Sequence, residues 1–330
     1  MNIKTMNVVN TNPNFTIVLP VNCNAKCDFC SWKTSNQDEK VGSDERFLEN
    51  LKKTLELLPS EFTQITISGG EPTLYKNLTK VLMLIGYHKD KFKKVVFTTN
   101  GIKLKECAKN PIFTEVVDFV NISRHHYEDS ENDKVMQTRS ITFEDVKEIS
   151  EILSLKGIPL NINCVIQEVK NEYSVNFIGE FIQKCRANYV NSITFRKDYD
   201  EGFGISNIEK TIQETYSPKQ ISECPVCLKT RYIINGMGVN FTTSEFEPKD
   251  VLGTNVYEVI MQPNGDLTID WDGDIIVDLV DDIVSKCDTK DLDDAFTVEK
   301  SKNVIDREPI DYYERTKRFS GCGFSMVRGC

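Results

Sequence analysis

Three cysteines near the N-terminus have a spacing that is typical of metal ligation. Cys23, Cys27 and Cys30 form a Cys-x3-Cys-x2-Cys pattern directly after a predicted strand. Three thiolates on one short loop can bind three irons of a cubane [4Fe–4S] cluster. The fourth iron then has no protein ligand and can be chelated by a small molecule. The alternative is zinc, which needs a fourth Cys or His nearby, but the nearest histidine is the distant His88.

A second motif, Gly69-Gly70-Glu71-Pro72, follows the second predicted strand. Its two glycines allow the backbone to approach a ligand closely and to adopt a positive φ. The Glu71 carboxylate can accept hydrogen bonds from an ammonium group, and Pro72 fixes the exit of the turn. Taken alone, the tetrapeptide is more typical of an ordinary turn than of a ligand site. Its position favours a site, because the ends of neighbouring parallel strands lie at one edge of a sheet.

Together the two motifs resemble those of the radical S-adenosylmethionine (SAM) superfamily. In that family an aromatic residue often precedes the third cysteine, and Phe29 occupies this position. Gly69 to Pro72 resemble the family's GGEP element, which binds the amino group of SAM. The resemblance implies that one electron cleaves SAM to methionine and a 5′-deoxyadenosyl radical, which abstracts hydrogen from a substrate. It also implies an external electron donor of the flavodoxin or ferredoxin type.

Polar residues at the ends of later strands extend the resemblance. Thr99 and Ser123 match positions that contact SAM in the radical SAM cyclases that convert GTP to a molybdopterin precursor. The fifth predicted strand also resembles theirs, and Asn163 and Gln167 are candidates to face the adenosine. For each of these residues the alternative is a polar strand end that bonds to the local backbone.

Four residues are candidates for catalysis or substrate contact. His125 and His126 follow the fourth predicted strand, where a histidine could relay a proton or contact a phosphate. The alternative is a solvated loop, because acidic residues follow closely. Lys229 and Arg231 fall at two basic positions of the GTP cyclases, so the resemblance implies an anionic substrate group. We therefore expect a nucleotide or another small phosphorylated molecule as the substrate.

The C-terminal part contains a further cysteine pair, Cys224 and Cys227, with metal-type spacing. In the GTP cyclases a Cys-x2-Cys pair and a third cysteine hold a second cluster, but Phe241 stands at the third position here. Cys322 and Cys330, near the end of the chain, could supply the missing ligands. Three interpretations stay open: structural zinc bound by these four cysteines, a second Fe–S cluster, or no metal.

The elements that must position these residues alternate between strands and helices. Repeated βα units predict an α/β fold, with a parallel sheet and helices outside. We expect a partial (β/α)6 TIM-like barrel over residues 14–202, and a smaller α+β region over residues 203–330 that covers the substrate. The predicted strands are Phe15–Leu19, Gln64–Ile67, Lys94–Thr98, Val116–Ile122, Ile158–Ile166 and Val190–Arg196, and the main predicted helices are Asp44–Leu58, Asn77–Gly86, Leu104–Ala108, Phe143–Lys156 and Ser174–Ala187.

Composition limits the classes of function. The net charge of −10 argues against a sequence-independent nucleic-acid binder, which needs a basic surface. No apolar run is long enough to span a membrane, and the N-terminus has no secretion signal. With eleven cysteines, seven of them in close groups, we expect a reducing, cytoplasmic location.

Three other functions remain as alternatives. A peptide-modifying radical SAM maturase with a degenerate C-terminal cluster (SPASM-like) domain is one, although little chain precedes the first predicted strand to recognise a leader peptide. A viperin-like nucleotide dehydratase is another, with no further feature that selects it. The third is a non-enzymatic interaction module that binds zinc through the same cysteines.

Overall fold

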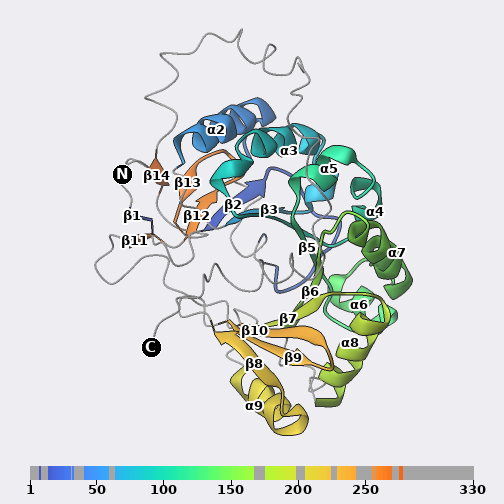
Figure 1. The fold of residues 1–330 in the computed structure, drawn as a ribbon. Helices are drawn as coiled ribbons and strands as arrows, with labels where there is room; N and C mark the ends of the chain where they lie inside the picture. Colours follow the sequence, from blue (N-terminus) through green and yellow to red (C-terminus); the bar gives the residue numbers. More distant parts are fainter. Residues whose placement is uncertain are drawn as a thin grey trace.

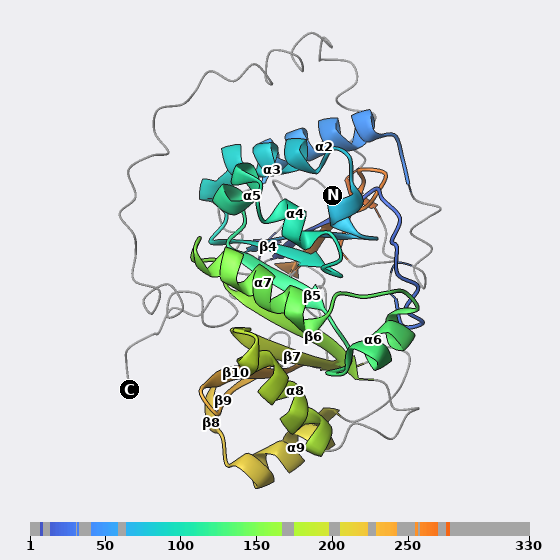
Figure 2. The same cartoon turned by 90° about the vertical axis from the view of Figure 1, so that its right-hand side faces the viewer.

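The computed structural model describes residues 7–8, 14–30, 32, 41–58, 64–166, 175–197, 205–223, 229–242, 255–256, 258–269 and 275–277 of the 330-residue chain. These residues form a strongly curved sheet with helices on its convex side (Figures 1 and 2). The order of its twelve strands is β14-β13-β12-β2-β3-β4-β5-β6-β7-β10-β9-β8. Strands β1 (Asn7–Val8) and β11 (Asn255–Val256) form a separate parallel pair.

The six predicted strands are all present and pair in parallel in chain order. Strand β12 adds in parallel to β2, and β10 adds in parallel to β7, so eight consecutive strands are parallel. Within the described part of the chain no ladder joins β14 to β8, and the barrel is therefore open. The strands are β2 (Asn14–Leu19), β3 (Gln64–Gly69), β4 (Lys94–Thr99), β5 (Phe119–Ser123), β6 (Leu160–Ile166), β7 (Ser192–Lys197), β8 (Lys219–Glu223), β9 (Thr230–Ile234), β10 (Met237–Thr242), β12 (Glu258–Met261), β13 (Leu267–Thr268) and β14 (Ile275–Val277).

Some of the helices begin at residues whose side chains cap them. Ser43 accepts a hydrogen bond from the backbone of α2, and Thr142 and Asp145 form a capping box at the start of α7. Among the described residues, no helix is both long and apolar enough to cross a membrane. The helices are α2 (Asp44–Leu57), α3 (Leu78–Tyr87), α4 (Leu104–Cys107), α5 (Pro111–Val116), α6 (Asp129–Met136), α7 (Phe143–Ser154), α8 (Val175–Ala187) and α9 (Ile205–Tyr216), with short 3-10 turns at Pro72–Leu74 and Lys89–Lys91.

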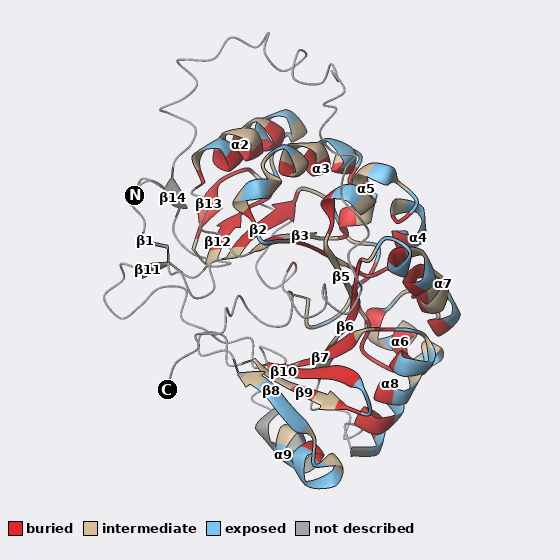
Figure 3. Ribbon diagram, in the orientation of Figure 1, coloured by how far each residue is buried: buried red, intermediate tan, exposed pale blue. Residues whose placement is uncertain are grey.

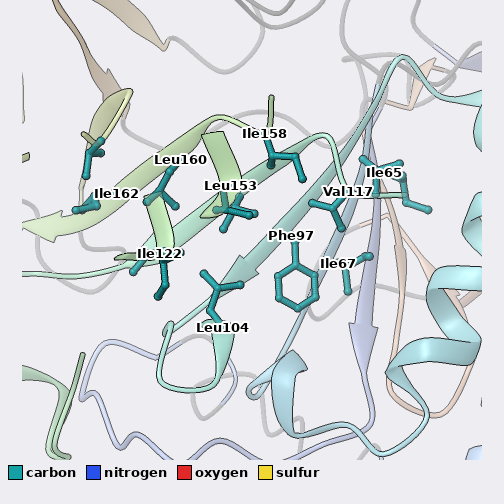
Figure 4. Close-up of a cluster of buried hydrophobic side chains, with 14 of the residues drawn as sticks. Ile65, Ile67, Phe97, Leu104, Val117, Ile122, Leu153, Ile158, Leu160 and Ile162 are labelled. Atoms are coloured by element: carbon teal, nitrogen blue, oxygen red, sulfur yellow. The ribbon is translucent and has the colours of Figure 1, made fainter. Parts of the chain in front are cut away.

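The two faces of the sheet differ because strand side chains alternate in direction. One set, which includes Ile65, Ile67, Phe97 and Ile122, is fully buried against the helices and forms the core (Figures 3 and 4). The alternate set points to the concave side, which we call the inner face. Many of its residues between β4 and β10 are polar, so the fold encloses a polar surface rather than a second core.

Two features differ from the predicted pattern. The predicted strand Val116–Ile122 begins too early, because Asn110 caps α5, Pro111 occupies its first turn, and Val116 ends that helix. The α+β region after residue 203 also contributes β10 and β12 to the parallel sheet. The sheet therefore continues across the expected boundary between residues 202 and 203, and the division into domains 14–202 and 203–330 stays a prediction.

Candidate functional site

The three N-terminal cysteines lie on the loop that leaves β2. Cys23, Cys27 and Cys30 are each partly exposed. Cys30 packs against a small apolar cluster on the inner face, formed by Val18 of β2, Ile260 of β12 and Trp32. The cysteine loop therefore packs against the inner face of the sheet beside strands β2 and β12.

Cys23 has hydrogen-bond donors directed at its sulfur. The backbone N–H of Ala25 lies 3.3 Å from Cys23 Sγ, and Asn100 Nδ2 lies 3.7 Å from it. Burial raises the pKa of the Cys23 thiol, and the neighbouring Glu71 carboxylate and Cys30 thiol raise it further, while the two hydrogen bonds oppose this. Donors of this kind stabilise cluster-bound thiolates and tune their potential.

The donor set fits a cubane cluster better than a single ion. Among the described residues no three His, Cys, Asp or Glu side chains converge closely enough to hold one metal ion. A cubane instead distributes three thiolates over three irons, and the Cys30 thiol is close enough to Cys23 to raise the pKa of the Cys23 thiol. The residues present therefore fit a [4Fe–4S] cluster at this loop.

Helix α6 and the loop before it hold the cysteine loop from the other side. The Lys26 backbone N–H donates to the Met136 carbonyl at 2.9 Å, and Gln137 Nε2 donates to an Asp28 carboxylate oxygen at 2.6 Å. The Phe29 ring meets the His125 ring edge to face, with centroids 4.6 Å apart. These contacts fix the loop before any ligand is bound.

The glycine pair is required by the close approach of β3 to β2. Gly69 has φ +144°, and a Cβ there would lie 2.9 Å from both Leu19 N and Leu19 O. At Gly70 a Cβ would lie 2.1 Å from the Val21 carbonyl oxygen and 2.8 Å from Cys23 N. Because glycine has no Cβ, the backbone of the second motif can lie directly against the cysteine loop.

Glu71 joins the ends of β3 and β4. Its carboxylate is 1% exposed. Oε1 accepts hydrogen bonds from Thr73 N at 3.0 Å, Thr73 Oγ1 at 2.5 Å and Thr99 Oγ1 at 2.6 Å, and Oε2 accepts one from Asn100 N at 2.7 Å. Pro72 is buried at the start of the following turn. Thr99, expected to contact SAM, is thus bonded to Glu71, while Asn100, which the sequence did not single out, links this carboxylate to Cys23.

Ser123 and Asn163 lie together on the inner face. They are register partners in the β5–β6 ladder, and the same row continues through Thr194 of β7 to Asn240 of β10 and Arg231 of β9. The predicted cofactor and substrate positions therefore share one row across five strands. Polar residues two apart in otherwise apolar strands are the sequence signal for this surface.

The two histidines are buried. His125 Nδ1 accepts a hydrogen bond from Val165 N of β6 at 3.0 Å, and its backbone N–H donates to Asn132 Oδ1 at 2.8 Å. Burial, with the adjacent Arg124, lowers the pKa of His125 to about 3, so its imidazole is neutral. His126 Nδ1 accepts from Glu128 N at 2.9 Å, and its ring stacks on a tyrosine. The catalytic role of both histidines stays a prediction, and the geometry gives each a structural task.

The predicted substrate residues lie at the far end of the row. Lys229 precedes β9, and Arg231 stands within that strand. Phe241, at the expected position of a third cluster cysteine, faces the helices and stacks on Phe195 with centroids 5.6 Å apart. A ligand at position 241 would therefore point away from Arg231. Gln167, Cys224, Cys227, Cys322 and Cys330 lie outside the described residues, so the second metal site stays a prediction.

Comparison with curated proteins identifies relatives of low identity. The probable GTP 3′,8-cyclase of Methanococcus vannielii is 28% identical over 177 residues, which cover 52% of this chain and 54% of that protein. The probable GTP 3′,8-cyclase of Methanococcus maripaludis is 25% identical over 244 residues (69% and 74%), and the GTP 3′,8-cyclase of Synechocystis is 27% identical over 206 residues (58% and 60%). The chain thus spans between about half and three quarters of the length of these relatives.

Comparison with solved structures confirms the fold. SuiB of Streptococcus suis superimposes with a TM-score of 0.53 at 16% identity, over 80% of this chain and 61% of that chain. Its complex with the precursor peptide SuiA gives a TM-score of 0.53 at 14% identity, over 80% and 60%. At this identity the likeness concerns the fold alone.

A family model gives the most specific match. The model of the radical SAM superfamily matches residues 17–178, which contain the cysteine loop, the glycine motif and strands β2 to β6. The cofactors that this family implies are a [4Fe–4S] cluster and SAM, and the donor set on the cysteine loop fits the cluster. The chain carries a radical SAM domain and belongs to the radical SAM superfamily of enzymes.

Proposed function

We propose that Cys23, Cys27 and Cys30 bind the [4Fe–4S] cluster, and that the enzyme acts on a small anionic substrate, such as a nucleotide or another phosphorylated metabolite. When bound, the cluster and SAM supply a 5′-deoxyadenosyl radical that removes a hydrogen atom from the substrate. An external donor of the flavodoxin or ferredoxin type supplies the electron. The inner face of the sheet holds the substrate beside SAM and shields both from water.

One observation carries the proposal of an anionic substrate, and it concerns Arg231. The guanidinium lies on the inner face, where Nη2 is 3.7 Å from the position of a Cβ at Gly238. Its Nε is buried without a hydrogen-bond acceptor, and no salt bridge of Arg231 occurs within the described part of the chain. Burial lowers the pKa of this guanidinium, but its intrinsic value is so high that it stays charged. A half-buried cation of this kind favours a bound carboxylate or phosphate.

The row of residues relates this cation to the cofactor end of the site. Three strand spacings separate Asn163 from Arg231, which is about 14 Å at the usual spacing of parallel and antiparallel strands. Ser123 and Asn163 would contact SAM, and a substrate that reaches both ends of the row is small and extended. The relatives are named GTP 3′,8-cyclases, which supports a nucleotide among the anionic candidates.

Anaerobic reconstitution with iron and sulfide tests both parts of the proposal. The protein should take up a cluster and, once reduced, form 5′-deoxyadenosine from SAM. Alanine at any one of Cys23, Cys27 or Cys30 should abolish this product. If SAM cleavage continues in these variants, the cluster assignment is wrong, and a colourless protein with stoichiometric zinc would support the interaction module instead.

The anion site is tested by substrate kinetics with GTP as the probe. Arg231→Ala should keep the cluster and the uncoupled cleavage of SAM, while KM for GTP rises at least about tenfold. Arg186→Ala, at an exposed position near the end of α8, is the matched control and should leave KM unchanged. An unchanged KM in the Arg231 variant would show that this cation does not bind the substrate.

A further inference from the structure

A hydrogen-bonded ladder of neutral side chains crosses the inner face between the two ends of the row. We infer that this ladder fixes Asn240 as a hydrogen-bond acceptor for the substrate, with Thr194 as the residue that sets its orientation. The ligand class follows: a small anion that carries an N–H or O–H donor close to its anionic group. This inference rests on the proposed function, because it assigns the neighbour of the Arg231 anion site.

The centre of the ladder is Asn161, whose hydrogen-bonding capacity is fully used. Its Nδ2 donates to Asn121 Oδ1 at 3.0 Å and to Asn163 Oδ1 at 2.9 Å. Its Oδ1 accepts from Ser192 Oγ at 2.7 Å and from Thr194 Oγ1 at 3.2 Å. Because a hydroxyl has a single proton, which Thr194 donates to Asn161, Thr194 can only accept a hydrogen bond from any other partner.

That restriction determines which end of Asn240 faces the interior. Asn240 Nδ2 donates to Thr194 Oγ1 at 3.1 Å and to the Ile193 carbonyl at 3.2 Å, so both of its amide protons are used. Within the described residues no group donates to Asn240 Oδ1. A reversed Asn240 amide would place its oxygen against the Thr194 oxygen and the Ile193 carbonyl, and is excluded. The substrate therefore meets a carboxamide oxygen at this position.

The opposite end of the ladder has the opposite polarity. Asn163 Oδ1 is occupied by Asn161, and no described acceptor receives the two protons of Asn163 Nδ2. The ladder thus presents donors at Asn163, on the side where SAM is proposed, and an acceptor at Asn240, on the substrate side. A ring nitrogen of an adenine satisfies the first requirement, and an N–H or O–H of the substrate satisfies the second.

The position of Asn240 beside Arg231 sets the spacing of the ligand groups. The two residues are register partners in the β9–β10 ladder, so their backbones are about 5 Å apart. Gly238 lies two residues from Asn240 on the same face, and a Cβ at this position would lie 3.7 Å from Arg231 Nη2, which places the guanidinium over Gly238 and beside Asn240. A donor bound by Asn240 therefore lies near the anion bound by Arg231.

Two ligands and three variants separate this role from a purely structural one. Binding of GTP and of inorganic triphosphate is measured by calorimetry under anaerobic conditions. Inorganic triphosphate supplies the anion without the donors of the nucleoside. Thr194→Val removes the hydroxyl that orients Asn240, whereas Ser192→Ala removes the other donor to the same Asn161 oxygen and leaves Asn240 in place. Thr194→Ser restores the hydroxyl.

We expect Thr194→Val to weaken the binding of GTP about tenfold, with triphosphate binding unchanged. Ser192→Ala and Thr194→Ser should retain the affinity for GTP. Three outcomes would each overturn the inference. Thr194→Val could weaken the binding of GTP and of triphosphate equally, or Thr194→Val and Ser192→Ala could weaken the binding of GTP equally. The third is that the wild-type protein binds GTP no better than triphosphate. If neither GTP nor triphosphate binds to the wild-type protein, both this inference and the anion site at Arg231 are wrong. Formation of 5′-deoxyadenosine reports separately on the cluster assignment.

Discussion

Replacement of Glu71 by glutamine tests whether the buried carboxylate holds the strand ends together before any cofactor binds. A glutamine has one oxygen and one NH2 group where the carboxylate has two oxygens. Three donors converge on Oε1 and only one, the Asn100 backbone N–H, meets Oε2. The amide oxygen must therefore take the Oε1 position, and the NH2 group then faces the Asn100 N–H across a 2.7 Å contact.

The expected loss in the free energy of unfolding follows from the hydrogen bonds that Glu71→Gln changes. One charge-assisted hydrogen bond, worth about 1.5–3 kcal/mol, is lost, and the buried Asn100 N–H is left without an acceptor. The three remaining bonds become neutral and weaker. We expect Glu71→Gln to lower the free energy of unfolding by about 2–4 kcal/mol. Glu49→Gln is the matched control, because Glu49 is half exposed and forms only an i,i+4 pair with Lys53, worth about 0.5 kcal/mol or less.

The assay is urea unfolding of the apo protein, without iron and SAM, so that no lost ligand contributes to the difference. The Glu71→Gln variant should unfold at a lower urea concentration with an unchanged slope. If Glu71→Gln and Glu49→Gln differ by less than about 0.5 kcal/mol, the four bonds to Glu71 do not hold the strand ends, and its task would have to be ligand binding alone.

Three further predictions concern other parts of the site. Gly70→Ala should reduce iron uptake on reconstitution, because its Cβ would lie 2.1 Å from the Val21 oxygen; Gly236→Ala, where nothing lies within 4 Å, should keep normal iron content, and equal iron in both would contradict the packing argument. Since the folded pKa of His125, about 3, is far below its ordinary 6.5, wild-type stability is lost as pH falls below 6.5. Relative to His125→Asn, which cannot titrate, the wild type should lose about 2 kcal/mol between pH 6.5 and pH 5 in urea unfolding, and parallel pH curves would refute the assignment. Phe241→Ala should cost about 3–5 kcal/mol of stability, and a loss below about 1 kcal/mol would show that Phe241 does not pack in the core.

Local sequence patterns were sufficient to predict the central strands and helices. The apolar run Phe15–Leu19 and the cap at Ser43 each place an element to within a few residues. The predicted strand began too early at Val116 for a local reason. Asn110 and Pro111 start a helix that ends at Val116, and the apolar residues there also fit a strand pattern. The edges of the sheet could not be predicted in this way. Strand β12 pairs with β2, although the two strands are far apart in the sequence. The local pattern of a short strand does not indicate which distant strand will pair with it.

The site was predictable in its parts but not in its connections. The spacing of Cys23 and its partners, and the glycine motif, placed both motifs at one edge of the sheet. The sequence could not show that Gly70 serves the approach of two backbones, or that Asn100 joins Glu71 to Cys23. Such links depend on the register between strands, which local patterns in a single sequence do not reveal. The neutral ladder around Asn161 was missed for the same reason, because its members come from four different strands.

Register also determines how far apart the two ends of the reaction site stand. Ser123 and Arg231 belong to one row, four strand spacings apart, or about 19 Å measured along the curved sheet. No hinge intervenes between them, since each step is a backbone ladder within one sheet. Under the proposed function, the separation between the SAM position and the substrate anion is therefore set by the sheet itself. On that proposal, a substrate whose reacting carbon lies at another distance from its anionic group would be held out of reach, and we expect the sheet to select substrates by length as well as by chemistry.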